Sequence, residues 1–240
     1  MTDVHLDNFS ENHPGTLRLT KIQNLIGKRM LESKLSKPCF YIESKADVTK
    51  LMDLRPELKK LFGVKITTNA FYIHALASAV KKYPIMVGRL EGDHIKIADR
   101  VNVGFAVNAP QGLVVPVIKD ADKKTLAEIA CLEKLLTEKA RSNKLTLEEI
   151  EGETIAFSNL GAYGIDSFIG IVPPPTSTIL AAGNAIRTVR PIEGNIAVRK
   201  MTSLTLAVDY RIINGTYAAG FLGFIKENLE NPKRLICQES

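Results

Sequence analysis

The amino-acid sequence predicts an α/β sandwich with a mixed β-sheet. Amphipathic helical segments and short apolar strand segments share the chain, and they do not alternate in the regular way that an all-parallel sheet requires. The chain has 240 residues, 45% of them hydrophobic, which is enough to bury one substantial core. It has no internal repeat, low-complexity tract or proline- and alanine-rich linker. We therefore expect residues 1–18 to be a flexible leader and residues 19–240 to form one domain.

The first half of the chain combines helical periodicity with short strands. Helices are predicted over residues 19–33, 48–62 and 68–84. The first begins with a capping box formed by Thr20 and Gln23. Strands are predicted over residues 39–48, in a hairpin over residues 86–99 and in a pair over residues 101–122. The hairpin turns at Gly92 and Asp93.

The second half opens with a long amphipathic helix that starts after Thr125, where Glu128 completes a second capping box. Strands are predicted over residues 154–160, 177–186, 195–201 and 202–210. Asn214 is expected to cap the last helix. The apolar stripe of that helix consists of Tyr217, Ala218, Phe221, Leu222, Ile225 and Leu229. We expect the helices to form the core against strands 113–118, 154–157, 178–182 and 204–208.

Charge and cysteine content narrow the function classes. The formal net charge is +6, but the basic residues are spread along the chain without interleaved aromatic residues. We expect no nucleic-acid binding, whereas a mild positive potential suits a phosphorylated small molecule. The cysteines Cys39, Cys131 and Cys237 are widely spaced, which predicts no metal site and favours a reducing, cytoplasmic setting. No apolar run approaches the ~20 residues of a membrane span.

Two stretches are candidate functional sites. Ser158 ends an apolar strand before a glycine turn, where its hydroxyl can donate a hydrogen bond; a serine that closes on its own backbone explains the same pattern. Residues 208–215 read VDYRIING and join the last strand to the last helix. Histidine offers no clear general base, because His74 lies within a helix, where a packing role is expected. No glycine-rich stretch has dinucleotide-loop spacing.

Four segments of the chain carry a family resemblance. They read GLVVPVIKDADKKTLAEIA, TIAFSNLGAYGIDSF, PPPTSTILAAG and ENLENPKRL. The chain resembles, over about residues 19–236, the catalytic domain of dihydrolipoamide acyltransferases, which form the cores of 2-oxoacid dehydrogenase complexes. The resemblance implies a chloramphenicol acetyltransferase-like fold, a two-layer α/β sandwich with a large mixed sheet that assembles as a trimer. It also implies channels between subunits, entered by coenzyme A from one side and lipoyl-lysine from the other.

The resemblance also assigns residues. In that family the strand-to-helix junction reads D-H-R-x-x-D-G; its histidine takes the thiol proton, and a serine in an S-N-x-G turn hydrogen-bonds the oxyanion. The corresponding residues here are Asp209, Tyr210, Arg211, Asn214, Gly215 and Ser158. The resemblance thus implies that Tyr210 replaces the histidine and that Asn214 replaces the aspartate. It further implies that Gln23 and Asn24 replace a basic pair and that Cys39 replaces a histidine. For Cys39 we expect a buried thiol, with a nucleophile as the alternative.

The change to tyrosine matters chemically. A thiol with a pKa of ~8.5 is mostly protonated at neutral pH, and an imidazole accepts its proton readily. A phenol with a pKa near 10 is a poor resting base, and loss of the base is expected to slow the reaction by roughly 100- to 10,000-fold. Ser158 can still stabilise an oxyanion. Asparagine caps a helix about as well as aspartate, so Asn214 need not weaken the fold.

Three hypotheses follow. The chain is a catalytically degenerate core protein that binds coenzyme A or an acyl-coenzyme A; it is a structural subunit that assembles with an active homologue; or it is an acyltransferase that moves an acyl group to a thiol or amine without a histidine. We expect a homotrimer or a higher multiple of trimers, with an active acyltransferase homologue as a second candidate partner. The family arrangement implies that Ser158 faces Tyr210 of a neighbouring subunit and that residues 101–107 lie in the channel wall. No D-K-A lipoyl-attachment hairpin is found in this chain.

Overall fold

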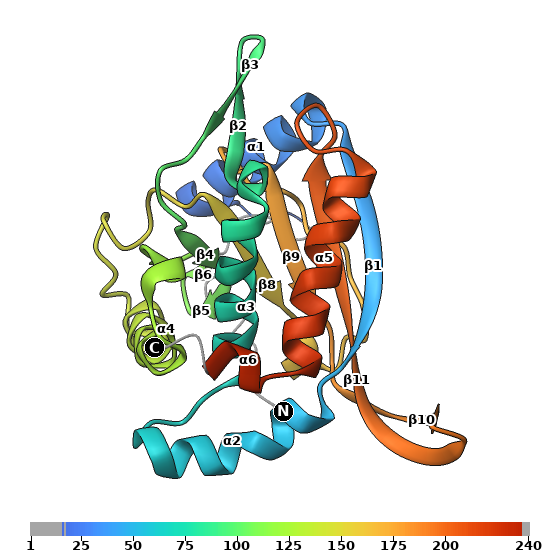
Figure 1. Ribbon diagram of the computed structural model, residues 1–240. Helices are drawn as coiled ribbons and strands as arrows, with labels where there is room; N and C mark the ends of the chain where they lie inside the picture. Colours follow the sequence, from blue (N-terminus) through green and yellow to red (C-terminus); the bar gives the residue numbers. More distant parts are fainter. Residues whose placement is uncertain (1–15, 17, 237–240) are drawn as a thin grey trace.

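The computed structural model describes residue 16 and residues 18–236 (Figure 1). Most of the predicted leader, and Cys237, lie outside the described residues. A seven-stranded sheet has the strand order β1-β11-β9-β8-β4-β7, with β10 also paired to β11. The strands are β1 (Cys39–Asp47), β4 (Val103–Phe105), β7 (Val117–Ile118), β8 (Ile155–Asn159), β9 (Thr178–Ala182), β10 (Ile186–Ile192) and β11 (Asn195–Asp209). Strand β8 runs parallel to β4 and β9, and the other pairs are antiparallel, so the sheet is mixed as predicted.

Two small hairpins stand apart from this sheet. One pairs β2 (Gly88–Glu91) with β3 (His94–Ile97), and the other pairs β5 (Val107–Ala109) with β6 (Gly112–Val114). Gly92 in the first hairpin and Gly112 in the second have positive φ angles, which glycine adopts without strain. Both hairpins lie where the sequence predicts them.

The five predicted helices lie in the predicted order, and the short helix α6 (Lys233–Ile236) was not predicted. The helices are α1 (Lys21–Ser36), α2 (Thr49–Phe62), α3 (Thr68–Lys82), α4 (Leu126–Arg141), α5 (Gly215–Glu230) and α6, with single 3-10 turns at Pro84–Val87, Ala121–Lys123 and Gly161–Tyr163. Both predicted capping boxes are present, and Asn214 caps α5. Helices α3 and α5 lie across the same face of the sheet, and α4 packs beside α3 (Figure 1).

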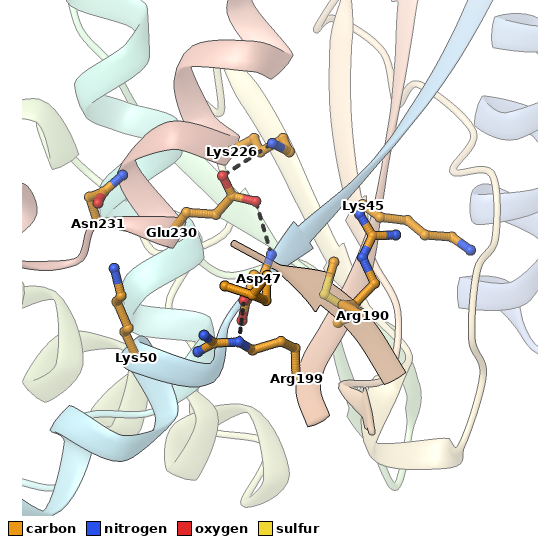
Figure 2. Close-up of a pocket in the computed structure, with 10 residues that line it drawn as sticks. Lys45, Asp47, Lys50, Arg190, Arg199, Lys226, Glu230 and Asn231 are labelled. Carbon is orange, nitrogen blue, oxygen red and sulfur yellow. Dashed lines mark hydrogen bonds and ion pairs between the residues drawn. The ribbon is translucent and has the colours of Figure 1, made fainter. Parts of the chain in front are cut away.

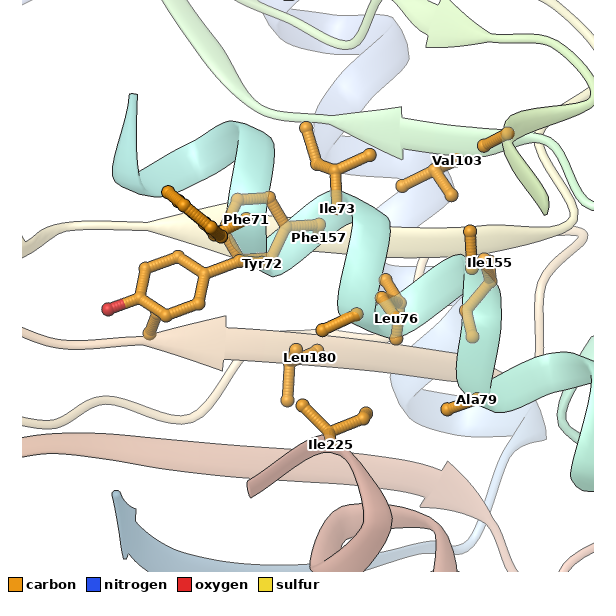
Figure 3. Close-up of a cluster of buried hydrophobic side chains, with 14 of the residues drawn as sticks. Phe71, Tyr72, Ile73, Leu76, Ala79, Val103, Ile155, Phe157, Leu180 and Ile225 are labelled. Atoms are coloured by element: carbon orange, nitrogen blue, oxygen red, sulfur yellow. The ribbon is translucent and has the colours of Figure 1, made fainter. Parts of the chain in front are cut away.

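The core forms between this helical layer and the sheet (Figure 3). Tyr72 and Phe157 meet with ring centroids 5.8 Å apart. The opposite face of the sheet carries a small separate cluster of Ala156, Val172, Ile179 and Ala207, against which Cys39 packs. Side chains of adjacent residues in a strand point to opposite faces, so Ser158 lies on the same face as Ala156.

Two strand predictions are wrong. The two strands predicted over residues 195–201 and 202–210 are one strand, β11, which ends at Asp209. Strand β10 was not predicted, because its two arginines and Pro191 interrupt its apolar residues. Residues 113–118 are not one core strand: Leu113 is 50% exposed, and only Val117 and Ile118 are buried in β7. The other three predicted core strands are buried.

None of the described helices is long and apolar enough to cross a membrane.

His74 is a packing residue, as predicted. It lies in α3 and is 5% exposed, and burial lowers the pKa of its imidazole to about 4, against a smaller raising effect of a hydrogen bond with the Lys124 backbone. Its Nδ1 has no hydrogen-bond partner among the described residues. The folded state therefore holds His74 neutral at physiological pH.

Acid should destabilise the fold through His74. Between its unfolded-state pKa of 6.5 and about pH 4, the unfolded chain binds a proton that the folded chain does not. The free energy of unfolding should therefore decrease as the pH is lowered through this window, by about 3 kcal/mol in total. Urea titrations at pH 7 and pH 4.5 should show that the free energy of unfolding decreases less for His74→Gln than for wild type. The control is His94→Gln, on the exposed hairpin; if all three proteins lose stability equally, His74 is not responsible.

Candidate functional site

The junction between β11 and α5 is held by an ion pair between neighbouring residues. Asp209 ends β11 and is 1% exposed. The Arg211 guanidinium donates from Nε to Asp209 Oδ1 at 2.9 Å and from Nη2 to Oδ2 at 2.6 Å, and the Arg211 backbone N–H donates to Oδ1 at 3.1 Å. This pairing raises the pKa of Arg211. The two-pronged contact satisfies a buried carboxylate and fixes the course of the chain on either side of Tyr210.

Tyr210 presents its side chain to solvent from this rigid frame. The residue is 55% exposed, its backbone N–H donates to the Pro38 carbonyl at 3.0 Å, and its ring lies 5.5 Å from that of Phe40. Its hydroxyl makes no hydrogen bond or ion pair with any described residue. The nearest basic group in sequence, Arg211, is engaged by Asp209.

Asn214 and Gly215 complete the turn into α5. The Asn214 side chain accepts a hydrogen bond from the Tyr217 backbone N–H at 2.9 Å, so asparagine performs the capping role that the sequence predicts. A Cβ on Gly215 would approach the Phe40 ring to 3.2 Å. The small residue at this position lets the start of α5 pack on the ring that also contacts Tyr210.

Ser158 is not part of this junction within one chain. It pairs with Ala181 in β9, and Ala181 pairs with Thr205 in β11, four residues before Asp209. With ~3.3 Å per residue along a strand and ~4.8 Å between strands, its Cα lies roughly 16 Å from that of Asp209. The described chain therefore brings Asp209, Tyr210, Arg211 and Asn214 together and leaves Ser158 apart.

The turn after Ser158 is firmly held. Asn159 Oδ1 accepts from the Gly161 backbone N–H at 2.7 Å, and the Leu160 N–H donates to the Ala182 carbonyl at 3.2 Å. A Cβ on Gly161 would lie 2.7 Å from the Gly183 carbonyl oxygen. This turn therefore requires glycine, as the S-N-x-G pattern indicates.

Cys39 lies opposite Asp209 in the β1–β11 register and is a half-buried free thiol. Burial raises its pKa, and the Asp209 carboxylate adds to that effect. Burial also lowers the pKa of nearby Lys37, whose Nζ donates to the Thr176 carbonyl at 2.6 Å. This environment disfavours a thiolate at Cys39 and supports the buried-thiol interpretation.

Gln23 and Asn24 serve the start of α1. Gln23 completes the capping box with Thr20, and Asn24 Nδ2 donates to the Thr20 carbonyl at 3.2 Å. Both side chains thus have local structural roles.

A basic pocket of about 380 Å³ lies beyond the other end of β1 (Figure 2). It is lined by Lys45, Asp47, Lys50, Arg190, Ile192, Arg199, Met201, Lys226, Glu230 and Asn231. The two carboxylates are engaged, since Asp47 lies 3.7 Å from Arg199 and Glu230 lies 3.1 Å from Lys226. Three further cations, Lys45, Lys50 and Arg190, make no ion pair with a described residue. The pocket therefore suits an anionic ligand.

One wall of the pocket lies on the face of the sheet that carries Ser158, whereas Lys226, Glu230 and Asn231 line the pocket from α5, which covers the opposite face. Met201 lies four residues before Thr205 in β11, so its side chain points to the same face as those of Thr205 and Ser158. The Cα atoms of Met201 and Ser158 are roughly 16 Å apart. Sequence reasoning missed this pocket because its cations come from four separate segments of the chain. Among the described residues, no group of three or more His, Cys, Asp or Glu side chains could hold a metal ion.

The chain and its fold match a known family. The family model described as 2-oxoacid dehydrogenases acyltransferase (catalytic domain) matches residues 11–237. The chain belongs to this family, which confirms the resemblance read from its motifs. Among curated relatives, the dihydrolipoyllysine-residue acetyltransferase component of the pyruvate dehydrogenase complex of Rickettsia bellii is 36% identical over 90% of this chain and 52% of that protein. The chain thus spans about half the length of the curated relatives it matches.

Solved structures of acetyltransferase cores support the same family assignment. The cubic core of a pyruvate dehydrogenase multienzyme complex superposes with a TM-score of 0.86 and 30% identity, covering 98% of both chains. The dihydrolipoamide acetyltransferase of Azotobacter vinelandii has a TM-score of 0.86 and 30% identity over 93% of this chain and 94% of that one. A chloramphenicol acetyltransferase, at 14% identity over 87% of this chain and 94% of that one, shares the fold with a TM-score of 0.52.

The Azotobacter vinelandii structure comes from work on the role of a serine, a histidine and an asparagine in that enzyme's catalytic mechanism. In its numbering, the histidine follows the serine by 52 residues and the asparagine follows the histidine by 4. Ser158, Tyr210 and Asn214 are separated by the same intervals of 52 and 4 residues. Tyr210 is as far along the sequence from Ser158 and Asn214 as that enzyme's histidine is from its serine and asparagine. Ser158 and Asn214 are of the same residue type as that serine and asparagine.

Removing Arg211 should destabilise the junction, because it leaves the Asp209 carboxylate buried without its counter-ion. Loss of one partner of a fully buried pair costs about 3–5 kcal/mol; because Arg211 is partly exposed, we expect about 2 kcal/mol for Arg211→Ala, measured by urea unfolding. The Asp209→Asn, Arg211→Ala double variant should lose less. A matched control is Arg89→Ala, which breaks the surface pair with Glu91. An effect no larger than that of the control would show that the junction pair is not structural.

Proposed function

We propose that this chain is an acyltransferase-family core protein that keeps the binding surface for coenzyme A or an acyl-coenzyme A and lacks standard lipoamide acetyltransferase activity. The observation that carries the proposal is Tyr210, an exposed phenol at the interval of a histidine, in an otherwise intact frame of Asp209, Arg211 and Asn214. Because an asparagine is also present in the Azotobacter vinelandii enzyme at this interval, we assign the loss to Tyr210 alone.

The missing function is that of a general base. Transfer of an acyl group to a thiol requires removal of the thiol proton, and a phenol accepts a proton poorly at neutral pH. The frame around Tyr210 therefore supports binding and assembly more than proton transfer.

The separation of Ser158 from Tyr210 supports an assembly in which each site forms between two copies. With roughly 16 Å between the Cα atoms of Ser158 and Asp209, one chain cannot place both Ser158 and Tyr210 at the same reacting carbonyl group. We therefore keep the homotrimer, or a multiple of trimers, as the proposed assembly. An active homologue is the second proposed partner, because its histidine would complete a site with Ser158 of this chain. The cytoplasm remains the proposed compartment.

The basic pocket supports coenzyme A as the ligand. Coenzyme A is elongated, with phosphate groups toward one end and the thiol at the other. A cationic pocket, and an oxyanion donor whose Cα lies roughly 16 Å from that of the pocket residue Met201, suit the two ends of such a molecule. The presence of Ser158 as an oxyanion donor also supports the alternative function. In this alternative the chain is an acyltransferase whose acceptor, an amine or an ionised thiol, needs no base.

Restoring the imidazole should restore chemistry. We expect wild type to transfer acetyl from acetyl-coenzyme A to dihydrolipoamide at a very low rate, and Tyr210→His to be faster by on the order of 100-fold or more. Tyr210→Phe is the matched control and should equal wild type. Adding Asn214→Asp should change little, because both residues cap a helix. Wild-type turnover at an ordinary enzyme rate of ~1–10³ s⁻¹, lost in Tyr210→Phe, would favour the alternative function.

Reversing charge in the basic pocket should weaken coenzyme A binding. Charge-assisted hydrogen bonds contribute about 1.5–3 kcal/mol each, so Lys50→Glu with Arg190→Glu should raise the Kd at least tenfold in calorimetry. The wild-type Kd should also rise with salt. The control is Lys134→Glu, at an exposed position of α4. If the pocket variant binds as wild type does, the phosphates lie elsewhere; if wild type does not bind coenzyme A, the ligand assignment fails.

A further inference from the structure

A chain of side-chain hydrogen bonds connects α4 to the turn after Ser158. Glu133 in α4 accepts from Thr67 Oγ1 at 2.9 Å and from Asn69 Nδ2 at 3.4 Å. Asn69 Oδ1 accepts from Asn159 Nδ2 at 2.7 Å. Asn159 Oδ1 accepts from the Gly161 backbone N–H at 2.7 Å. The chain therefore joins residues from α3, α4 and β8 that are distant in sequence.

The chain has a fixed direction. An ionised carboxylate only accepts hydrogen bonds, and a backbone N–H only donates, so Glu133 and Gly161 define its two ends. Each asparagine between them must turn its NH2 group toward Glu133 and its oxygen toward Gly161. If either amide were flipped, two donors or two acceptors would face each other. The carboxylate of Glu133 thus sets the orientation of Asn159.

Glu133 is buried, so its place in this chain is not incidental. The residue is 7% exposed, and burial raises the pKa of its carboxyl, while the bonds from Thr67 and Asn69 act in the opposite direction. A buried carboxylate is unfavourable unless it is hydrogen-bonded. Its partners lead to one end of β8, where Asn159 directly follows Ser158.

We propose that Glu133 and Asn69 are positioning residues for Ser158, acting through the orientation of Asn159. This rests on the proposed function in one respect, namely that Ser158 is the oxyanion donor. Such a donor must be held at the place where negative charge develops, and a small displacement forfeits much of its effect. The Ser158 turn is held on one side by the hydrogen bond from the Leu160 N–H to the carbonyl of Ala182 at the end of β9, and on the other side by the chain from Glu133.

Three variants separate positioning from bulk packing. Glu133→Gln keeps an acceptor that can face Asn69, so the direction of the chain persists. Glu133→Leu removes the acceptor, and Asn69→Leu breaks the chain one step nearer to Ser158 and serves if Glu133→Leu does not fold. Asn228→Leu is the matched control, because Asn228 is a buried asparagine of α5 whose Nδ2 has no partner among the described residues.

The first measurement is hydrogen–deuterium exchange by mass spectrometry on peptides that cover residues 159–164, with the full-length protein. Glu133→Leu and Asn69→Leu should raise exchange there by on the order of tenfold, since a lost hydrogen bond is worth about 1–2 kcal/mol. Glu133→Gln and Asn228→Leu should match wild type. Unchanged exchange in both leucine variants, or equal increases in Glu133→Gln and Glu133→Leu, would overturn the proposal.

The second measurement adds each variant to Tyr210→His and follows acetyl transfer to dihydrolipoamide. Glu133→Leu should lower kcat by on the order of tenfold or more and leave KM for acetyl-coenzyme A little changed, and Glu133→Gln should retain most of the kcat. A general packing defect would lower the kcat of both leucine variants and of the Asn228→Leu control by the same factor, and this result would contradict a positioning role. If Tyr210→His is inactive, the proposed function fails and the exchange measurement alone decides the role of Glu133.

Discussion

Strand β11 is the constraint on which the rest of the structure depends. Nine consecutive residues, 201–209, are buried, and the strand pairs with β1, β9 and β10 along its length. Because side chains in a strand alternate strictly, one register fixes three features: the Asp209 junction at one end, the level of Ser158 in the middle and the wall of the basic pocket at the other end. A slip of one residue would turn Asp209, Thr205 and Met201 away together.

The junction contains residues that stabilise the fold and one residue, Tyr210, whose side chain is exposed to solvent. Asp209 and Arg211 hydrogen-bond to each other, and Asn214 hydrogen-bonds to the backbone at the start of α5. Tyr210 lies between them with a constrained backbone and an exposed side chain. The stability of the junction therefore depends little on which aromatic group occupies position 210, and the frame can persist when the chemistry changes.

Much of the fold could be predicted from the sequence where the determinants are local. The capping boxes at Thr20 and Thr125 and the Asn214 cap each lie within four residues, and the candidate junction lies within eight. Strand β10 was missed because most of its residues are exposed and carry no alternation. The basic pocket and the chain from Glu133 to Asn159 could not be predicted, since they join segments whose proximity only the tertiary fold creates.

The exposure of Tyr210 has a consequence for the history of this chain. Tyrosine and histidine codons differ by a single nucleotide, and an imidazole ring can keep the aromatic contact with Phe40. Selection for folding alone would not distinguish the two residues, because the hydroxyl of Tyr210 contacts no described partner. A single point mutation can therefore exchange one ring for the other at position 210, in either direction, without passing through an intermediate that misfolds.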